Sequence, residues 1–108
     1  MLSGNPEHVV LGDNIKVTLT CVTDDDNTFV SWTKDQRKIA DIKDNCAFTS
    51  IPDDTYNYAC DVANTIYYLI IPPDAITDGI QNTTWRCLPV FGKGSNTWNL
   101  TVSGTYGV

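Results

Sequence analysis

Four cysteines carry the most distinctive chemistry in this chain of 108 residues: Cys21, Cys46, Cys60 and Cys87. None of them forms a C-x-x-C pair, and His8 is the one histidine, so the clustered soft ligands of a zinc site are missing from the sequence. An even number of cysteines in a small chain predicts two disulfides and an oxidising compartment, and three different pairings satisfy that prediction.

Three adjacent aspartates, Asp24, Asp25 and Asp26, form a second candidate group, because carboxylate oxygens are calcium ligands. Asp53 and Asp54 could complete such a ligand set. The spacing lacks the alternation and the glycine of a calcium-binding loop. We therefore predict a solvated acidic loop, with no metal ion and no cofactor, and keep calcium binding as the alternative.

No arrangement of residues in the sequence is typical of an active site. His8 stands alone, the nucleophile motif Gly-x-Ser-x-Gly does not occur, and no buried pair of carboxylates can be assigned. The expectation is a protein that is not an enzyme.

The balance of charge limits the classes of partner. Thirteen acidic residues against seven lysines and arginines give a net charge of −6. An acidic surface without a basic cluster attracts neither a phosphate backbone nor anionic headgroups, so no nucleic-acid partner is expected. No apolar run reaches the roughly 18 residues of a membrane span, so we expect no direct membrane insertion of this domain.

Asn82 and Asn99 each begin an Asn-x-Thr triplet, the acceptor pattern for N-glycosylation in secreted proteins. Strand alternation would place Asn99 on the outer side of the last strand, next to the face that carries Arg86 and Leu88. A glycan at Asn99 would hinder that sheet as a surface for a partner.

Period-2 alternation of apolar and polar residues dominates the chain, and helical periodicity is almost absent. From Ile15 to Cys21, for example, every second residue would face the core while Lys16, Thr18 and Thr20 face water. The predicted strands are residues 7–10, 15–23, 29–34, 37–40, 46–51, 55–61, 65–71, 83–91 and 97–102.

Polar and glycine-containing or proline-containing segments connect these strands. They are the loop 24–28, the connection 41–45, the hairpin tip 52–54, the crossover 74–81 with one helical turn, and the tight hairpin loop 92–96. The predicted fold is all-β: a sandwich of two antiparallel sheets with seven to nine strands. It forms one domain over residues 1–108, with its core in residues 7–103. Because the first residues lack a signal segment, we interpret Met1 as an expression start on a domain cut from a longer secreted or membrane-anchored protein.

Alternation also divides the aromatic residues. Its parity places three tryptophans in the core, namely Trp32, Trp85 and Trp98. Tyr56 and Tyr58 share one face of the predicted hairpin. Adjacent Tyr67 and Tyr68 must point to opposite faces. One or two of these four tyrosines should therefore be exposed, where tyrosine is favoured in interfaces.

Several short motifs together resemble an immunoglobulin-superfamily domain over residues 7–103. They are Leu19-Thr20-Cys21, Val30-Ser31-Trp32-Thr33-Lys34, Tyr68-Leu69-Ile70-Ile71, Trp85-Arg86-Cys87 and Leu100-Thr101-Val102. Cys21 precedes Trp32 by 11 positions and Cys87 by 66. The resemblance implies a Cys21–Cys87 disulfide that joins the two sheets, with Trp32 packed against it. A further pair, Cys46–Cys60, would pin the predicted hairpin.

The Cys-to-Cys spacing and the segment 35–51 are closer to the variable or intermediate sets of this family than to the constant set. Trp85 stands where the family has its corner tyrosine, so the hydroxyl of that corner is missing. The combination of Ile70-Ile71-Pro72 and Thr84-Trp85-Arg86-Cys87 with an additional cysteine pair is similar to invertebrate, particularly molluscan, immunoglobulin-like domains. The run Phe91-Gly92-Lys93-Gly94 is similar to an antigen-receptor joining segment, but three residues after Cys87 leave no room for a hypervariable loop. We predict a glycine-bearing hairpin turn there.

The resemblance implies an extracellular recognition or adhesion module, with an invertebrate immune-type or self-recognition role. Its partner would be a protein or glycan ligand on a cell or microbial surface, or a second copy of the domain. We expect contacts from the loops 24–28 and 92–96, the hairpin 46–60, or the sheet that carries Arg86. The candidate binding residues are Asp24, Asp25, Asp26, Tyr56, Tyr58, Arg86 and Lys93. The alternative function is a structural spacer in a multidomain cell-surface or secreted protein.

Overall fold

The computed structural model describes residues 2–23, 29–43, 46–49, 51–61, 66–76, 82–89 and 96–103. Its strands are β1 (Leu2–Asn5), β2 (His8–Val10), β3 (Val17–Val22), β4 (Phe29–Lys34), β5 (Arg37–Lys43), β6 (Asn57–Asp61), β7 (Ile66–Ile71), β8 (Thr83–Pro89) and β9 (Trp98–Ser103). A short 3-10 turn, η2 (Pro73–Ala75), follows β7 because two successive prolines end that strand.

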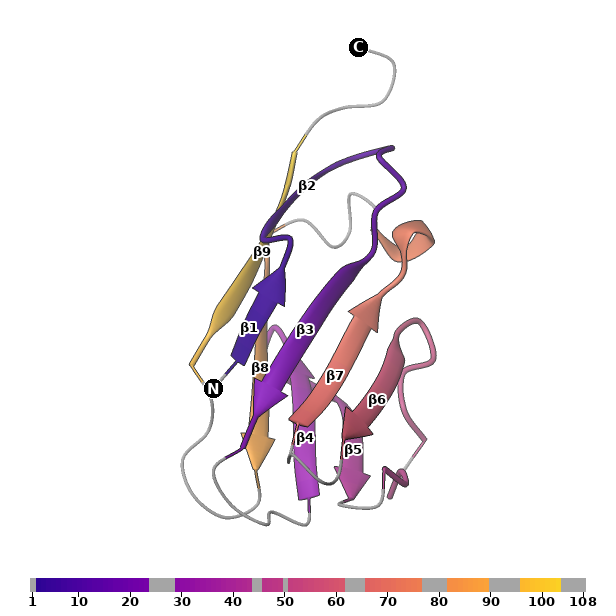
Figure 1. Ribbon diagram of the computed structural model, residues 1–108, viewed down its shortest axis with the longest axis vertical. Helices are drawn as coiled ribbons and strands as arrows, with labels where there is room; N and C mark the ends of the chain where they lie inside the picture. Colours follow the sequence, from indigo (N-terminus) through magenta and orange to yellow (C-terminus); the bar gives the residue numbers. More distant parts are fainter. Residues whose placement is uncertain are drawn as a thin grey trace.

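The strands form two packed sheets, which confirms the predicted all-β sandwich (Figure 1). One sheet has the order β1-β3-β7-β6 and the other β2-β9-β8-β4-β5. One pairing departs from the antiparallel prediction, because β2 runs parallel to β9, with Val9 opposite Val102. The chain therefore changes sheets between β1 and β2, close to Pro6.

Alternation positions the core as predicted in the longest strands. In β3, β7, β8 and β9 every second side chain is buried between the sheets, while the residues between them are half-buried or exposed. Trp32 and Trp85 are fully buried, and Trp98 is 7% exposed. Ile15 does not follow this pattern. It precedes β3 and is 44% exposed, so the prediction that it faces the core is wrong.

Strand β1 was not predicted from the sequence, because the predicted core began at residue 7. Leu2 is 1% exposed and lies opposite Cys21 in β3. Gly4 lets β1 pass close to Trp98, since a Cβ atom at this position would overlap the Trp98 ring. The Asn96 side chain also holds Leu2, with its Oδ1 accepting from the Leu2 N–H at 2.9 Å. These contacts join residues far apart in the sequence, so local propensity gave no sign of the strand.

The region after residue 40 differs most from the prediction. β5 continues to Lys43, whereas residues 41–45 were predicted to be a polar connection. Residues 46–49 and 51–53 form no strand of a hairpin. They run along β5 instead, with Lys43 N–H donating to Ala47 O at 2.8 Å and Asp53 N–H donating to Ile39 O at 2.8 Å. This segment covers the outer edge of β5, and β6 pairs with β7.

Candidate functional site

The outer face of the five-stranded sheet carries most of the described polar and charged candidates. Arg86 lies near its middle in β8, half-buried and directly opposite Thr33 of β4. Leu88 lies opposite Ser31, and Thr84 lies opposite Asn99. The buried Trp85 and Cys87 on either side of Arg86 face the core, so Arg86 points outward as predicted.

Asp41 lies on the same outer face and was not among the predicted site residues. Its carboxylate is 5% exposed, and it accepts a 2.5 Å hydrogen bond from the Ser31 hydroxyl at Oδ1. The Lys38 ammonium lies 3.0 Å from Oδ2. A buried carboxylate is tolerated when it is paired and hydrogen-bonded, which explains how an aspartate sits inside β5. Its low strand propensity led to the wrong prediction of a loop at this position.

The two Asn-x-Thr triplets meet on the same sheet. The Thr84 hydroxyl donates to Asn99 Oδ1 at 3.0 Å, and both side chains belong to glycosylation triplets. Asn99 is exposed on the outer face of β9, as alternation predicted, and Asn82 is exposed in the turn before β8. A glycan is carried on the amide nitrogen, so the hydrogen bond to Oδ1 leaves the attachment atom of Asn99 accessible.

The Cys46–Cys60 disulfide anchors a second cluster at the edge of the sandwich. Phe48 and Tyr58 pack edge to face with ring centroids 5.5 Å apart, beside a hollow of about 50 Å³. The Tyr58 hydroxyl donates to the Asp53 carbonyl oxygen at 2.9 Å. Burial raises the pKa of the Tyr58 phenol, and the Asp53 carboxylate raises it further. Tyr58 is therefore a neutral hydrogen-bond donor, and its bond to Asp53 holds the segment beside β5 against β6.

Tyr56 is not available for binding. It is 5% exposed, and its ring packs edge to face on Trp85 with centroids 5.4 Å apart. The prediction that it serves as a surface contact is wrong, because the assumed hairpin would have turned it outward and the actual segment turns it into the core. Tyr67 is also buried, whereas Tyr58 and Tyr68 are half-buried.

Trp32 and Trp85, the two tryptophans near the Cys21–Cys87 disulfide, differ in the hydrogen bonding of their indole N–H groups. Trp32 lies opposite Cys87 in the β4–β8 pair, and Cys21–Cys87 joins β3 to β8 with 6.4 Å between the Cα atoms. The Trp85 indole N–H donates to Thr83 Oγ1 at 2.8 Å. This bond satisfies the indole within its own strand, so it does not reproduce a tyrosine corner, which bonds to the backbone. The Trp32 indole N–H has no partner in the part of the chain that the structure describes.

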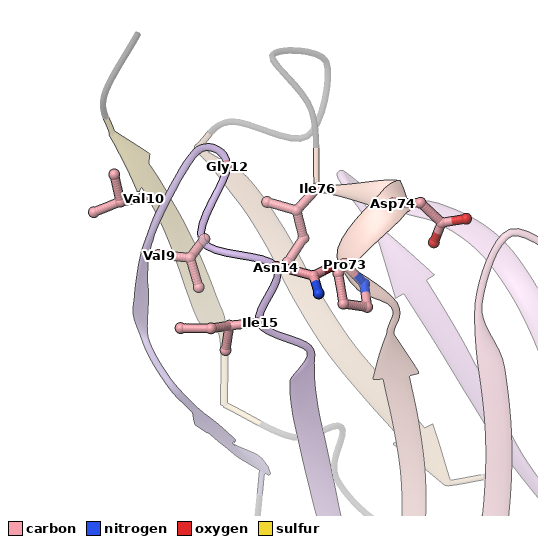
Figure 2. Close-up of a pocket in the computed structure, with 8 residues that line it drawn as sticks. All are labelled: Val9, Val10, Gly12, Asn14, Ile15, Pro73, Asp74 and Ile76. Carbon is pink, nitrogen blue, oxygen red and sulfur yellow. The ribbon is translucent and has the colours of Figure 1, made fainter. Parts of the chain in front are cut away.

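An open hollow of about 150 Å³ lies at the end of the sandwich where β2 leads into β3 (Figure 2). It is lined by Val9, Val10, Gly12, Asn14, Ile15, Pro73, Asp74 and Ile76. Val10 and Ile15 are each more than 40% exposed there. The hollow is open, with polar Asn14 and Asp74 beside the apolar side chains of its lining, and it brings no nucleophile and base together.

Four predicted binding residues, Asp24, Asp25, Asp26 and Lys93, lie outside the described residues. The predicted loop 24–28 lies there with them, as do residues 92–95 of the predicted loop 92–96. Over the described ranges, no group of three or more His, Cys, Asp or Glu side chains is placed to hold a metal ion. Nor does a helix in those ranges have the length and apolar character needed to cross a bilayer.

No protein-family profile and no curated protein matches the chain. The fold and the placement of the side chains therefore carry the functional argument by themselves.

Proposed function

We propose that the chain is an extracellular immunoglobulin-like recognition module that binds a protein or glycan ligand on a cell or microbial surface. The binding surface is the outer face of the five-stranded sheet, and the role is invertebrate immune-type or self-recognition. Two disulfides support an oxidising compartment.

Strand order supports the immunoglobulin assignment. The sheet β1-β3-β7-β6 corresponds to the A-B-E-D sheet of that fold, and β9-β8-β4 corresponds to G-F-C. β5 adds one strand beyond C, where a constant-type domain has none and a variable-type domain has two. The order therefore favours an intermediate type, in which the chain passes from β5 along the sheet edge directly to β6.

Arg86 is the single observation that carries the choice of surface. A half-buried arginine near the middle of a sheet face, with threonine, serine and leucine side chains around it, has the composition of interface centres, in which arginine is enriched. Its guanidinium offers several donors in a fixed plane, which suits carboxylates of a protein and hydroxyls or acidic groups of a glycan.

Binding of the purified domain to microbial particles, animal cells and immobilised glycans tests this proposal. We expect Arg86→Ala to weaken capture at least tenfold. Arg37→Ala removes the same charge from the exposed first residue of β5 and should change capture less than twofold. Equal loss in both variants would mean that net charge alone attracts the ligand. Absence of capture by the wild-type domain would contradict the proposal.

A spacer function is the second candidate, favoured by the positions of the chain ends. Leu2 of β1 lies beside Cys21 at one end of the sandwich, and Ser103 of β9 lies beside Val10 at the other. This arrangement suits domains joined in a row. A domain that captures nothing in the assay above and stays monomeric would favour the spacer.

A further inference from the structure

The outer face of the four-stranded sheet has an apolar stripe along its centre. Ile66, Tyr68 and Ile70 of β7 point outward and are half-buried, because their neighbours in the strand fill the core. Val22, opposite Ile66, is 42% exposed and continues the apolar surface. Ala59 of β6 lies opposite Tyr68 on the other side.

Hydroxyl and amide side chains surround this stripe. They are Thr18 and Thr20 of β3, Ser3 and Asn5 of β1, and Asn57 of β6, all placed on this face by the strand registers. Among the described strand residues of the face, Asp61 is the one charged side chain, and it lies at the end opposite Ile66. Lys16, which is exposed directly before β3, adds a second charge next to Thr18. The face thus carries few charges on a chain of net charge −6.

These properties suit a second copy of the same chain. Two molecules of charge −6 repel through most of their surfaces, and a face with few charges is where they can approach at least cost. A hydroxyl group both donates and accepts, so a rim of threonine and serine can pair with its own copy, whereas a surface of one charge cannot. Across a two-fold axis the same patch meets itself.

We propose that two copies of this domain associate through the outer faces of their β1-β3-β7-β6 sheets, with Tyr68 at the centre of the contact. Four strands at about 4.8 Å spacing and five residues at about 3.3 Å cover a flat area of about 300 Å². A stable complex buries about 800 Å² on each partner, so the pairing is weak and forms only at high protein concentration. Asn99 lies on the opposite sheet, so a glycan attached there would leave this face open.

This inference goes beyond the proposed function, because it concerns the other sheet and needs no ligand. The two proposals therefore fail independently: ligand capture reports on Arg86, and self-association reports on Tyr68. Sedimentation of the 108-residue chain from about 10 µM to 1 mM measures the pairing.

We expect the wild-type domain to form dimers in the upper part of that range. Tyr68→Glu should abolish them. Thr101→Glu is the matched control, because it adds the same charge to an exposed position of β9 on the opposite face and should leave dimers unchanged. If Tyr68→Glu fails to fold, Val22→Lys serves as the second variant, since Val22 is exposed at the rim of the stripe.

Salt and NMR shifts sharpen the test. Added salt screens the repulsion between the acidic molecules, so dimers should strengthen with salt, whereas a contact made by ion pairs would weaken. Amide shifts that change with concentration should map to β3 and β7. A domain that stays monomeric at 1 mM, equal effects of Tyr68→Glu and Thr101→Glu, or shifts confined to β8 and β9 would overturn the inference.

Discussion

The two disulfides lie at different depths in the sandwich. Cys21–Cys87 connects inner strands and is essentially unexposed, with 1% and 0% of its two residues accessible. Cys46–Cys60 connects the segment after β5 to the edge strand β6, and Cys46 is exposed. The comparison indicates that Cys21–Cys87 belongs to the core, whereas Cys46–Cys60 fixes the segment that runs along the edge strand β5.

Removing the central disulfide should have the largest effect. A loop of 66 residues contributes about 4 kcal/mol through the entropy of the unfolded chain, and a cavity between the sheets adds to the loss. Natural domains have about 5 to 15 kcal/mol of stability in total. We expect Cys21→Ala/Cys87→Ala to be largely unfolded at 37 °C in circular dichroism. A variant that unfolds within 1 kcal/mol of the wild type in urea would contradict the central role of this disulfide.

Removing the edge disulfide should cost less. A loop of 14 residues contributes about 3 kcal/mol at most. Cys46 is exposed, and Cys60 is half-buried against the core from the edge strand β6. We expect Cys46→Ala/Cys60→Ala to stay folded but to be cleaved faster by protease within residues 46–53. Native mass spectrometry with a mild dithiol gives a second measurement, in which alkylation should appear at Cys46 and Cys60 before Cys21 and Cys87. The reverse order of alkylation would refute the difference in depth.

The smallest effect is expected from Tyr58→Phe, which tests the edge cluster without touching a disulfide. Loss of the hydrogen bond to the Asp53 carbonyl should lower the free energy of unfolding by about 1 kcal/mol at pH 8. Burial raises the pKa of the folded phenol above the value of the unfolded chain. The stability it contributes is therefore complete below about pH 10 and is lost as the pH rises further.

Urea midpoints at pH 8 and pH 10.5 measure this contribution. The difference between wild type and Tyr58→Phe should shrink at the higher pH, because the unfolded wild-type chain gains stability by releasing the phenol proton. A difference that stays constant or grows with pH would show that the phenol does not titrate in this way.

Alternation predicted the inner strands well because each of their faces is consistently buried or solvated. β3, β7, β8 and β9 begin and end within about two residues of the prediction, and both expected disulfides are present. The edge elements were predicted poorly. Asp41 was predicted to lie in a loop, but it belongs to β5, where Ser31 and Lys38 bind its carboxylate. Tyr56 was predicted to be a surface residue, but its ring packs on Trp85.

The candidate surfaces divide in the same way. The outward position of Arg86 and Asn99 follows from the parity of their strands, so the sequence was sufficient to place them on the outer face. That Ile66, Tyr68 and Ile70 lie among mostly uncharged neighbours depends on which strands pair with β7, and no local pattern contains that information.

The sequence by itself determined the fold class, the inward and outward faces of the long strands, and the resemblance that implied the disulfide pairs. Tertiary structure alone decided the pairing of β1 with β3, the length of β5 and the path of the segment beside it. The physical reason is the sequence distance over which the deciding contacts act. Alternation is read from adjacent residues, whereas Gly4 in β1 and Asp41 in β5 fit only because Trp98, Ser31 and Lys38 are brought to them by the fold.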